Sequence, residues 1–329
     1  MANRDRRTLI ILLSAIAGIA LLVLPLFLGK YHIHIATTIL FFGYLGMAWN
    51  LLGGYAGQFS FGHAAFFGIG AFTSSLLQIH AGVNPWVGMV LAGTAGTLLG
   101  LFIGYLCFRY GLKGPYFALA MLAVAEMLRL VAIQWMTTKY PLGINLPLKG
   151  NSFLDFQFTS KIPYYYVMLF MASGLLFLTH RIEVNKIGLY FKAIRENENA
   201  AESLGVNAFK TKMIAMALSS FFTAIGGTYY AQYYLTLDEE AAFGTAVSIE
   251  ALLGPILGGA GTVFGPILGA CILELLSETS RNFLGGYSGV HLMVYGLVLV
   301  IVIIFLPNGI LGGIKTLFRS ASRQRRQQE

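Results

Sequence analysis

Charged residues are scarce in this sequence, and their scarcity excludes an ordinary soluble fold. Only 11% of the 329 residues are charged, whereas 57% are hydrophobic, far more than a soluble domain needs to fill its core. Apolar runs of about 20 residues, the length of a membrane-crossing helix, recur along the chain, with no polar segment long enough for a separate soluble domain. Because helices satisfy their own backbone groups in lipid, we predict an all-α polytopic membrane protein, one domain over residues 1–329.

Cysteine and catalytic motifs are also nearly absent. Cys107 and Cys271 are the two cysteines, and both fall inside apolar runs, where a thiol behaves as a small hydrophobe. Neither a disulfide framework nor a metal site is predicted. The chain has no GxxxxGK[ST] motif and no hydrolase triad, so it is not a P-loop ATPase. We predict that it is not an enzyme and needs no cofactor, and that energy for any transport comes from an ion gradient or another protein.

The apolar runs predict a bundle of about ten transmembrane or re-entrant helices. One of these runs is short and is interrupted by glycines and Pro255, so it is either a full span or a re-entrant half-helix. The polar stretch 137–161 is the longest loop on the side opposite the basic segments. The predicted spans cover residues 9–28, 33–52, 64–79, 85–108, 115–135, 163–179, 213–234, 246–257, 267–276 and 291–306.

Basic residues predict the orientation. The amino tail, the turn 109–114, the segment 181–212 and the carboxyl tail hold 16 of the 22 Lys and Arg, against 5 in the loops between them. The positive-inside rule then places both termini and segment 181–212 in the cytoplasm, with an even number of spans. Since the basic residues flank apolar spans and form no aromatic-interleaved stripe, the formal charge of +8 favours a topology signal over nucleic-acid binding.

Segment 181–212, here named the cytoplasmic loop, is the longest charged interruption of the apolar pattern. Within it, IRENENAAESLG (194–205) predicts one helix of about ten residues, with acids near its start, where the helix dipole favours them, and Gly205 as its stop. Such a helix is about 15 Å long, too short and too charged to cross a bilayer of about 30 Å. It should offer a small rigid surface to another protein.

Two intramembrane features are candidates for a translocation path. The stretch GYAGQFSFGHAAFFGIGAF (54–72) combines glycines with polar side chains, and its irregular backbone must be buried in protein or line a cavity. It either lines the path or packs tightly against neighbouring helices, to which its polar side chains then bond. A metal-binding or proton-transfer role for His63 is a third alternative. Glu126 and Arg129 are three residues apart on one helix face and either pair structurally or contact cargo. The path candidates are Gln58, Ser60, Phe61, Gly62, His63, Glu126 and Arg129.

Small residues suggest close helix approach elsewhere. Every fourth position of the span 213–234 carries a small residue, at Ser219, Thr223 and Gly227. These residues lie on one side of a helix, which allows a helix of this chain or of another subunit to pack closely against it. A second glycine-rich break at 258–265 is similar to the first at 54–62. This similarity is compatible with an internal repeat, a common feature of transporters with broken helices.

Four stretches together resemble the permease subunits of bacterial ATP-binding-cassette (ABC) importers, specifically the branched-chain amino acid permeases. They are GYAGQFSFGHAAFFGIGAF, GPYFALAMLAVAEMLR, AIRENENAAESLGVNAFKTKMIAMALSSFFTAIGG and GGAGTVFGPILGA, spread over about 40–307. In this family, a cytoplasmic EAA-x-x-x-G helix docks on the ATPase subunit. Here the pattern reads Asn199-Ala200-Ala201-x-x-x-Gly205, with Asn in place of the leading acid. The coupling residues implied are Arg195, Glu196, Glu198, Asn199, Ala200, Ala201, Glu202 and Gly205.

The resemblance implies an inner-membrane importer with several partners. These are two ABC ATPase subunits, a second permease subunit and a periplasmic substrate-binding protein, besides membrane lipid. Branched-chain amino acids are the expected cargo, with urea, short amides or other amino acids as alternatives. A gradient-driven secondary transporter, with Glu126 as its coupling residue, and an intramembrane enzyme are the rivals from other classes. The first rival predicts transport by this chain alone.

Overall fold

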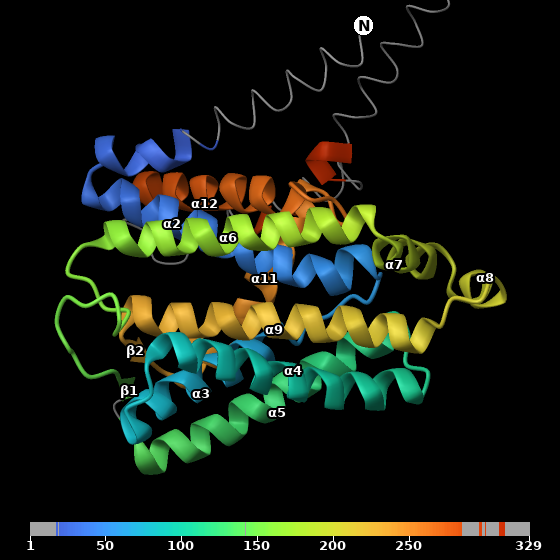
Figure 1. Cartoon of the computed structure of the whole chain (residues 1–329), viewed down its shortest axis with the longest axis horizontal. Coiled ribbons are helices and arrows are strands. Elements are labelled where there is room, and N and C mark those ends of the chain that lie inside the picture. Colours follow the sequence, from blue (N-terminus) through green and yellow to red (C-terminus); the bar gives the residue numbers. More distant parts are fainter. Residues whose placement is uncertain are drawn as a thin grey trace, which may run out of the picture.

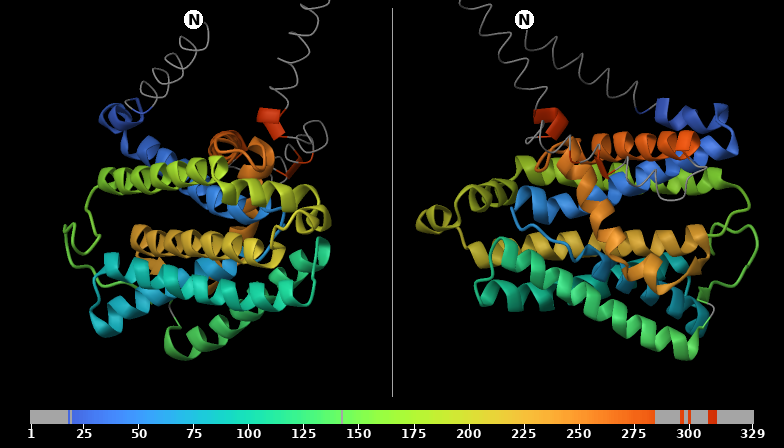
Figure 2. Two further views of the ribbon diagram at one scale, coloured as in Figure 1. Left: turned by 45° about the vertical axis from the view of Figure 1, so that its right-hand side comes forward. Right: turned by 180° about the vertical axis from the view of Figure 1, so that it is seen from behind.

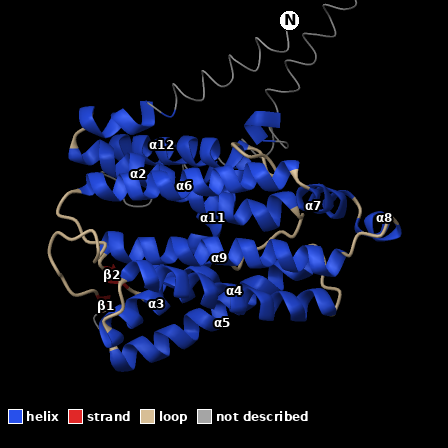
Figure 3. Ribbon diagram, viewed as in Figure 1, coloured by secondary structure: helices blue, strands red, loops and turns tan. Residues whose placement is uncertain are grey.

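The computed structural model describes residues 18, 20–141, 143–284, 296–297, 300 and 309–312. Most of these residues are helical (Figure 3). Most of the predicted span 291–306 and half of the span 9–28 lie outside the described residues. The elements are α2 (Lys30–Asn50), the π-helical turn η1 (Leu51–Tyr55), α3 (His63–Ala81), α4 (Pro85–Arg109), α5 (Pro115–Lys139), β1 (Ile144–Asn145), α6 (Lys161–Val184), α7 (Lys186–Glu196), α8 (Glu198–Ser203), α9 (Ala208–Tyr234), β2 (Thr236–Leu237), α10 (Glu239–Phe243), α11 (Thr245–Gly258) and α12 (Gly265–Leu284).

Local sequence explains where the long helices begin and end. Gly82, with φ of 61°, ends α3 in the left-handed region that favours glycine. Asn84 caps α4 by accepting the backbone N–H of Trp86 at 2.9 Å, and Pro85 occupies the first helical position. Asn207 caps α9 in the same way. These caps satisfy backbone groups that lipid would leave unpaired.

The long helices form two layers joined by α11. In Figure 1, α2, α6 and α12 lie in one layer and α3, α4, α5 and α9 in the other. Seen from behind, α11 passes from one layer to the other (Figure 2), and it contacts α2, α12, α3 and α5. At one end of the bundle, β1 pairs antiparallel with β2, with Ile144 opposite Leu237. The opposite end carries α7 and α8 (Figure 1).

Six helical segments of the described chain are long and apolar enough to cross a membrane. They are Lys30–Tyr55, His63–Ala81, Pro85–Arg109, Pro115–Lys139, Lys161–Val184 and Glu239–Gly258. The first joins α2 to η1, and the last joins α10 to α11. The equally long α9 and α12 were also predicted as spans, but they are more polar. The predicted total of about ten therefore stays a prediction.

The small-residue stripe of α9 packs within this chain. Gly227 lies against the backbone of α3, and Ser219 Oγ donates to the Ala48 carbonyl oxygen of α2 at 2.8 Å. Thr223 is buried between them and donates to the Ser219 carbonyl oxygen of its own helix. The sequence left open whether the partner helix belonged to another subunit; the structure gives α3 and α2.

Candidate functional site

Segment 181–212, which the sequence predicts to be a cytoplasmic loop, protrudes from the end of the bundle as two helices (Figure 1). The single predicted helix over 194–205 is wrong, because the chain breaks at Asn197. That residue is extended, with φ of −159° and ψ of 107°, and its side chain accepts the backbone N–H of Ala200 at 3.1 Å. Asn197 is therefore the N-cap of α8, a preference of asparagine that competes with helix continuation. Glu196 ends α7, whereas Glu198 lies in the first turn of α8.

The carboxyl end of α8 confirms the predicted stop at Gly205. Gly205 has φ of 87°. Its N–H donates to the Glu202 carbonyl oxygen at 2.9 Å, and the N–H of Val206 donates to that of Ala201 at 3.0 Å. These two bonds form a Schellman motif, which fixes the end of the helix.

The two alanines of α8 have different environments. Ala201 is 2% exposed and packs with Ile194 of α7 and Ala208 of α9. Ala200 is exposed, as are Asn199, Glu202 and the Leu204 side chain beyond them. The outer face of α8 is thus small and mixed in character, while its inner face locks α8 onto the neighbouring helices.

Glu198 anchors α8 to the bundle. Its carboxylate accepts from Lys212 Nζ at 2.8 Å and pairs with Lys113 Nζ at 3.4 Å. Lys212 is 3% exposed and also lies over the Phe108 ring. Partial burial acts to raise the pKa of Glu198, but the Lys212 hydrogen bond and the two ammonium charges outweigh it and lower the pKa below its usual value. Glu198 therefore faces inward and leaves Asn199 and Glu202 as the outward polar groups.

The lowered pKa predicts an acid-sensitive anchor. Because the folded-state pKa of Glu198 is depressed, its contribution to stability is present above the unfolded pKa of about 4.3. It is lost as pH falls through the lower folded value. Hydrogen exchange of residues 198–205, corrected for intrinsic rates, should stay constant from about pH 7 to 5 and rise below the folded pKa. Glu198→Gln should show the faster exchange already at pH 7; wild-type exchange in that variant would contradict the anchor.

The first glycine-rich break is buried in protein. After η1, residues 56–62 run without regular structure to α3, and most are buried. Trp49 Nε1 donates to the Ser60 carbonyl oxygen at 2.8 Å, and Gln58 Nε2 donates to the Ala56 carbonyl oxygen at 3.2 Å. These bonds satisfy irregular backbone that lipid does not tolerate. Gly62 is packed so closely on Met121 of α5 that a side chain would collide with it.

His63 and Phe61 differ in what they face. His63 is fully buried, with Nε2 2.8 Å from Ser219 Oγ. Since Ser219 donates its one proton to Ala48, it accepts from His63, which places the imidazole proton on Nε2. Phe61 instead lines an apolar hollow with Phe59 and the first turns of α5. Phe61 thus borders an open space, whereas Ser60, Gly62 and His63 are buried.

Glu126 and Arg129 form a bidentate pair on α5. Arg129 Nη2 donates to Glu126 Oε1 at 2.6 Å, and Arg129 Nε to Oε2 at 2.9 Å. A third bond of 3.3 Å joins Arg129 Nη1 to Glu240 of α10. The Glu126 side chain is 39% exposed. The pair lies about halfway along a predicted span, on the face that α5 shares with α10, and is separate from the buried Ser60 and His63.

The two glycine-rich breaks meet through Asn50, which sequence reasoning missed. Asn50 Oδ1 accepts the backbone N–H of Gly261 at 2.8 Å, and its Nδ2 donates to the Thr262 carbonyl oxygen at 2.9 Å. A side chain at Gly54 would collide with both Asn50 and Gly261. The similar sequences of the two breaks indicated that they belong together. Nothing in the sequence indicated that a single buried asparagine, Asn50, links them.

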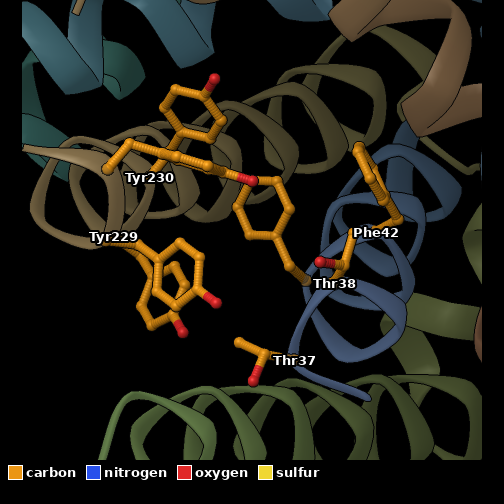
Figure 4. Close-up of a pocket in the computed structure, with 8 residues that line it drawn as sticks. Thr37, Thr38, Phe42, Tyr229 and Tyr230 are labelled. Carbon is orange, nitrogen blue, oxygen red and sulfur yellow. The ribbon is translucent and has the colours of Figure 1, made fainter. Parts of the chain in front are cut away.

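An aromatic pocket between the layers was also missed. Figure 4 shows it between α2 and α9. Tyr233 OH lies 2.7 Å from His34 Nδ1, and Tyr229 OH donates to the Tyr164 carbonyl oxygen at 2.9 Å. About 30 Å³ is open to water-sized molecules, room for about two waters. The signal was the run TYYAQYY, whose tyrosines fall on one side of a helix. The lining residues are Thr37, Thr38, Phe41, Phe42, Tyr229, Tyr230, Tyr233 and Tyr234.

Comparisons with known proteins identify the family to which the chain belongs. Residues 31–303 match the family model described as branched-chain amino acid transport system / permease component. The chain is 29% identical over 320 residues to the high-affinity branched-chain amino acid transport system permease protein LivM of Escherichia coli (strain K12), covering 89% of this chain and 74% of that protein. It is 28% identical over 183 residues to the guanosine ABC transporter permease protein NupQ of Bacillus subtilis (strain 168), covering 50% and 55%.

A further relative matches a shorter part of the chain. The chain is 26% identical over 148 residues to the high-affinity branched-chain amino acid transport system permease protein LivH of Escherichia coli (strain K12), covering 45% of this chain and 46% of that protein. No solved structure matches the chain. The family match spans most of the chain and is a match to a transport permease family, which supports the prediction that the chain is not an enzyme. This multi-pass membrane protein therefore belongs to the family of branched-chain amino acid transport system permease components.

Proposed function

We propose that this chain forms half of the translocation path of an ATP-driven importer of branched-chain amino acids. The cargo follows from the family and from relatives named for branched-chain amino acid transport. The observation that carries the coupling mechanism is the cytoplasmic loop, which combines an inner face locked by Ala201 and Glu198 with an exposed outer face. Such a rigid protrusion can be displaced as a unit by an ATPase bound to Ala200, Glu202 and Asn199.

The orientation follows from charge. With α7 and α8 in the cytoplasm, Arg109, Lys113 and the basic residues of the cytoplasmic loop lie on the positive side, as the inner membrane requires. Both termini then lie in the cytoplasm as well. The end that carries β1 and β2 faces the periplasm, where a substrate-binding protein would deliver cargo.

The wall of the path is the face formed by α5, α10 and α11. These helices lie together on the side seen from behind in Figure 2. Glu126 and Arg129 of α5 and Glu240 of α10 are all at least partly exposed there. Because intramembrane charges avoid lipid and face protein or water, this face borders the second permease subunit and an aqueous path. Phe61 borders the same side through its hollow against α5; Gln58, Ser60, Gly62 and His63 support the wall from behind.

ATPase stimulation tests the partners and the cargo together. The chain is co-expressed with a second permease and ATPase subunits, purified from membranes, and assayed with substrate-binding proteins loaded with leucine, urea or ribose. The expected result is co-purification and stimulation by the leucine-loaded protein. Stimulation by the urea-loaded protein alone would replace the cargo, and failure of the chain to retain ATPase subunits would contradict the importer.

A further inference from the structure

Arg195, the penultimate residue of α7, lies between the two glycine-rich breaks. Its Nη1 donates to the Gly54 carbonyl oxygen at 2.8 Å. A side chain at Gly57 would come within 2.8 Å of Arg195 Cγ, and one at Gly261 would collide with the guanidinium itself. Gly57 and Gly261 also have φ of 69° and 75°, which favour glycine. In the position that it occupies, the arginine therefore uses space that both breaks leave open by lacking side chains.

The two breaks around Arg195 are already joined to each other. The Asn50 side chain binds Gly261 and Thr262, so the end of α2 with η1 and the connection from α11 to α12 are held together. The π-helical η1 is itself a rare geometry that occurs frequently at functional sites. One side chain of the cytoplasmic loop thus contacts a unit that reaches into both layers of the bundle.

The remaining contacts of Arg195 are weaker. Its Nη2 lies 3.2 Å from Glu196 Oε1, but the Glu196 side chain is 76% exposed, and a pair so exposed contributes little. The bond to Gly54 is charge-assisted and partly buried, which makes it the stronger of the two. Arg195 therefore contributes most of its interaction energy through its contacts with the breaks.

We infer that Arg195 is the positioning residue that transmits movement of α7 and α8 to both glycine-rich breaks. Displacement of the cytoplasmic loop changes the Arg195 contact with Gly54 and Gly261 and, through Asn50, moves α2 and α11 together. This inference rests on the proposed docking of an ATPase on the cytoplasmic loop. It assigns Arg195 to transmission inside the permease instead of to the ATPase contact.

The test uses the complete transporter in lipid vesicles, with Arg195→Ala, Arg195→Lys and the control Lys186→Ala. Lys186 is the exposed first residue of the same helix, so its loss removes one α7 charge without touching η1, Gly54 or Gly261. Two quantities are measured: leucine transported per ATP hydrolysed, and hydrogen exchange of residues 53–57, 198–205 and 258–262 with and without vanadate-trapped nucleotide.

In the wild type, trapping should change exchange in all three segments. In Arg195→Ala, residues 198–205 should still respond while both breaks do not. Leucine transported per ATP should fall at least tenfold, with ATP hydrolysis within twofold of wild type. Arg195→Lys keeps a donor for Gly54 and should recover part of the coupling, whereas Lys186→Ala should match wild type.

A wild-type response of both breaks in Arg195→Ala, or unchanged leucine per ATP, overturns the inference. Should the alanine variant not assemble, Arg195→Gln, which keeps part of the aliphatic stem but cannot reach Gly54, decides it by the same two measurements. A wild-type transporter that hydrolyses ATP and moves no leucine contradicts the proposed cargo, and the exchange measurement then still decides the role of Arg195. Absence of any nucleotide response in wild-type residues 198–205 contradicts the docking and the inference together.

Discussion

Replacing Gly227 with leucine is expected to prevent the folded bundle from forming. Gly227 of α9 faces the backbone of α3, and a β-carbon there would collide with the Phe67 carbonyl oxygen and lie 2.9 Å from the Ala71 nitrogen. Thr228 binds the Gly70 carbonyl oxygen beside it. Backbone cannot yield as a flexible side chain does, so the two helices must separate. We expect the free energy of unfolding to fall by about 3 kcal/mol or more, which is the upper end of the cost of overpacking a core.

Size-exclusion chromatography in detergent and thermal unfolding measure this effect. Gly227→Leu should give little monodisperse protein and a sharply lowered melting temperature. The matched control is Gly174→Leu on α6, because a β-carbon at Gly174 meets no atom within 4 Å. That control should be as stable as wild type. Equal melting temperatures for the two leucine variants would mean that α3 and α9 do not approach as described.

Replacing Ala201 with tryptophan is expected to abolish leucine uptake while leaving the permease inserted. Ala201 is 2% exposed between Ile194 and Ala208, with no room for an indole. The larger side chain forces α8 away from α7 and α9, so an ATPase that engages α8 no longer moves the bundle. Uptake should fall at least tenfold, with membrane insertion and the melting temperature of the transmembrane bundle largely retained.

The control for this variant is Ala200→Ser on the exposed side of the same helix. A hydroxyl there meets solvent or the ATPase and should leave uptake within about twofold of wild type. Uptake, ATP hydrolysis and membrane level are measured in parallel for both variants. Unimpaired uptake by Ala201→Trp would show that the inner packing of α8 is not needed for coupling.

Much of the fold was predictable because lipid imposes a strong pattern. The runs that became α4 and α6 read directly as spans, and the span predicted to begin at residue 85 does begin there as α4. The break at Asn197 was misread because ENAAES continues a helix-favouring composition. Whether the helix breaks at Asn197 depends on whether the asparagine side chain caps α8 or points to solvent. The tertiary contacts of Glu198 with Lys212 and Lys113 favour the cap.

The candidate site was predictable in part. The acid and base of α5 were found from spacing alone, and the structure joins Glu126 to Arg129. The third partner, Glu240, lies 111 residues away, a separation that no local pattern encodes. Sequence reasoning also missed the Asn50 link between the breaks and the Arg195 contact with Gly54, because each joins residues more than 100 positions apart.

Leucine uptake into lipid vesicles, with and without the ATPase subunits, tests the central claim most directly. Vesicles that contain this chain, a second permease and the ATPases, supplied with ATP and a leucine-loaded binding protein, should accumulate leucine. Omitting the ATPases or replacing ATP with a non-hydrolysable analogue should abolish accumulation, and an imposed proton or sodium gradient should not restore it. Leucine accumulation by this chain alone, driven by such a gradient, would contradict the account.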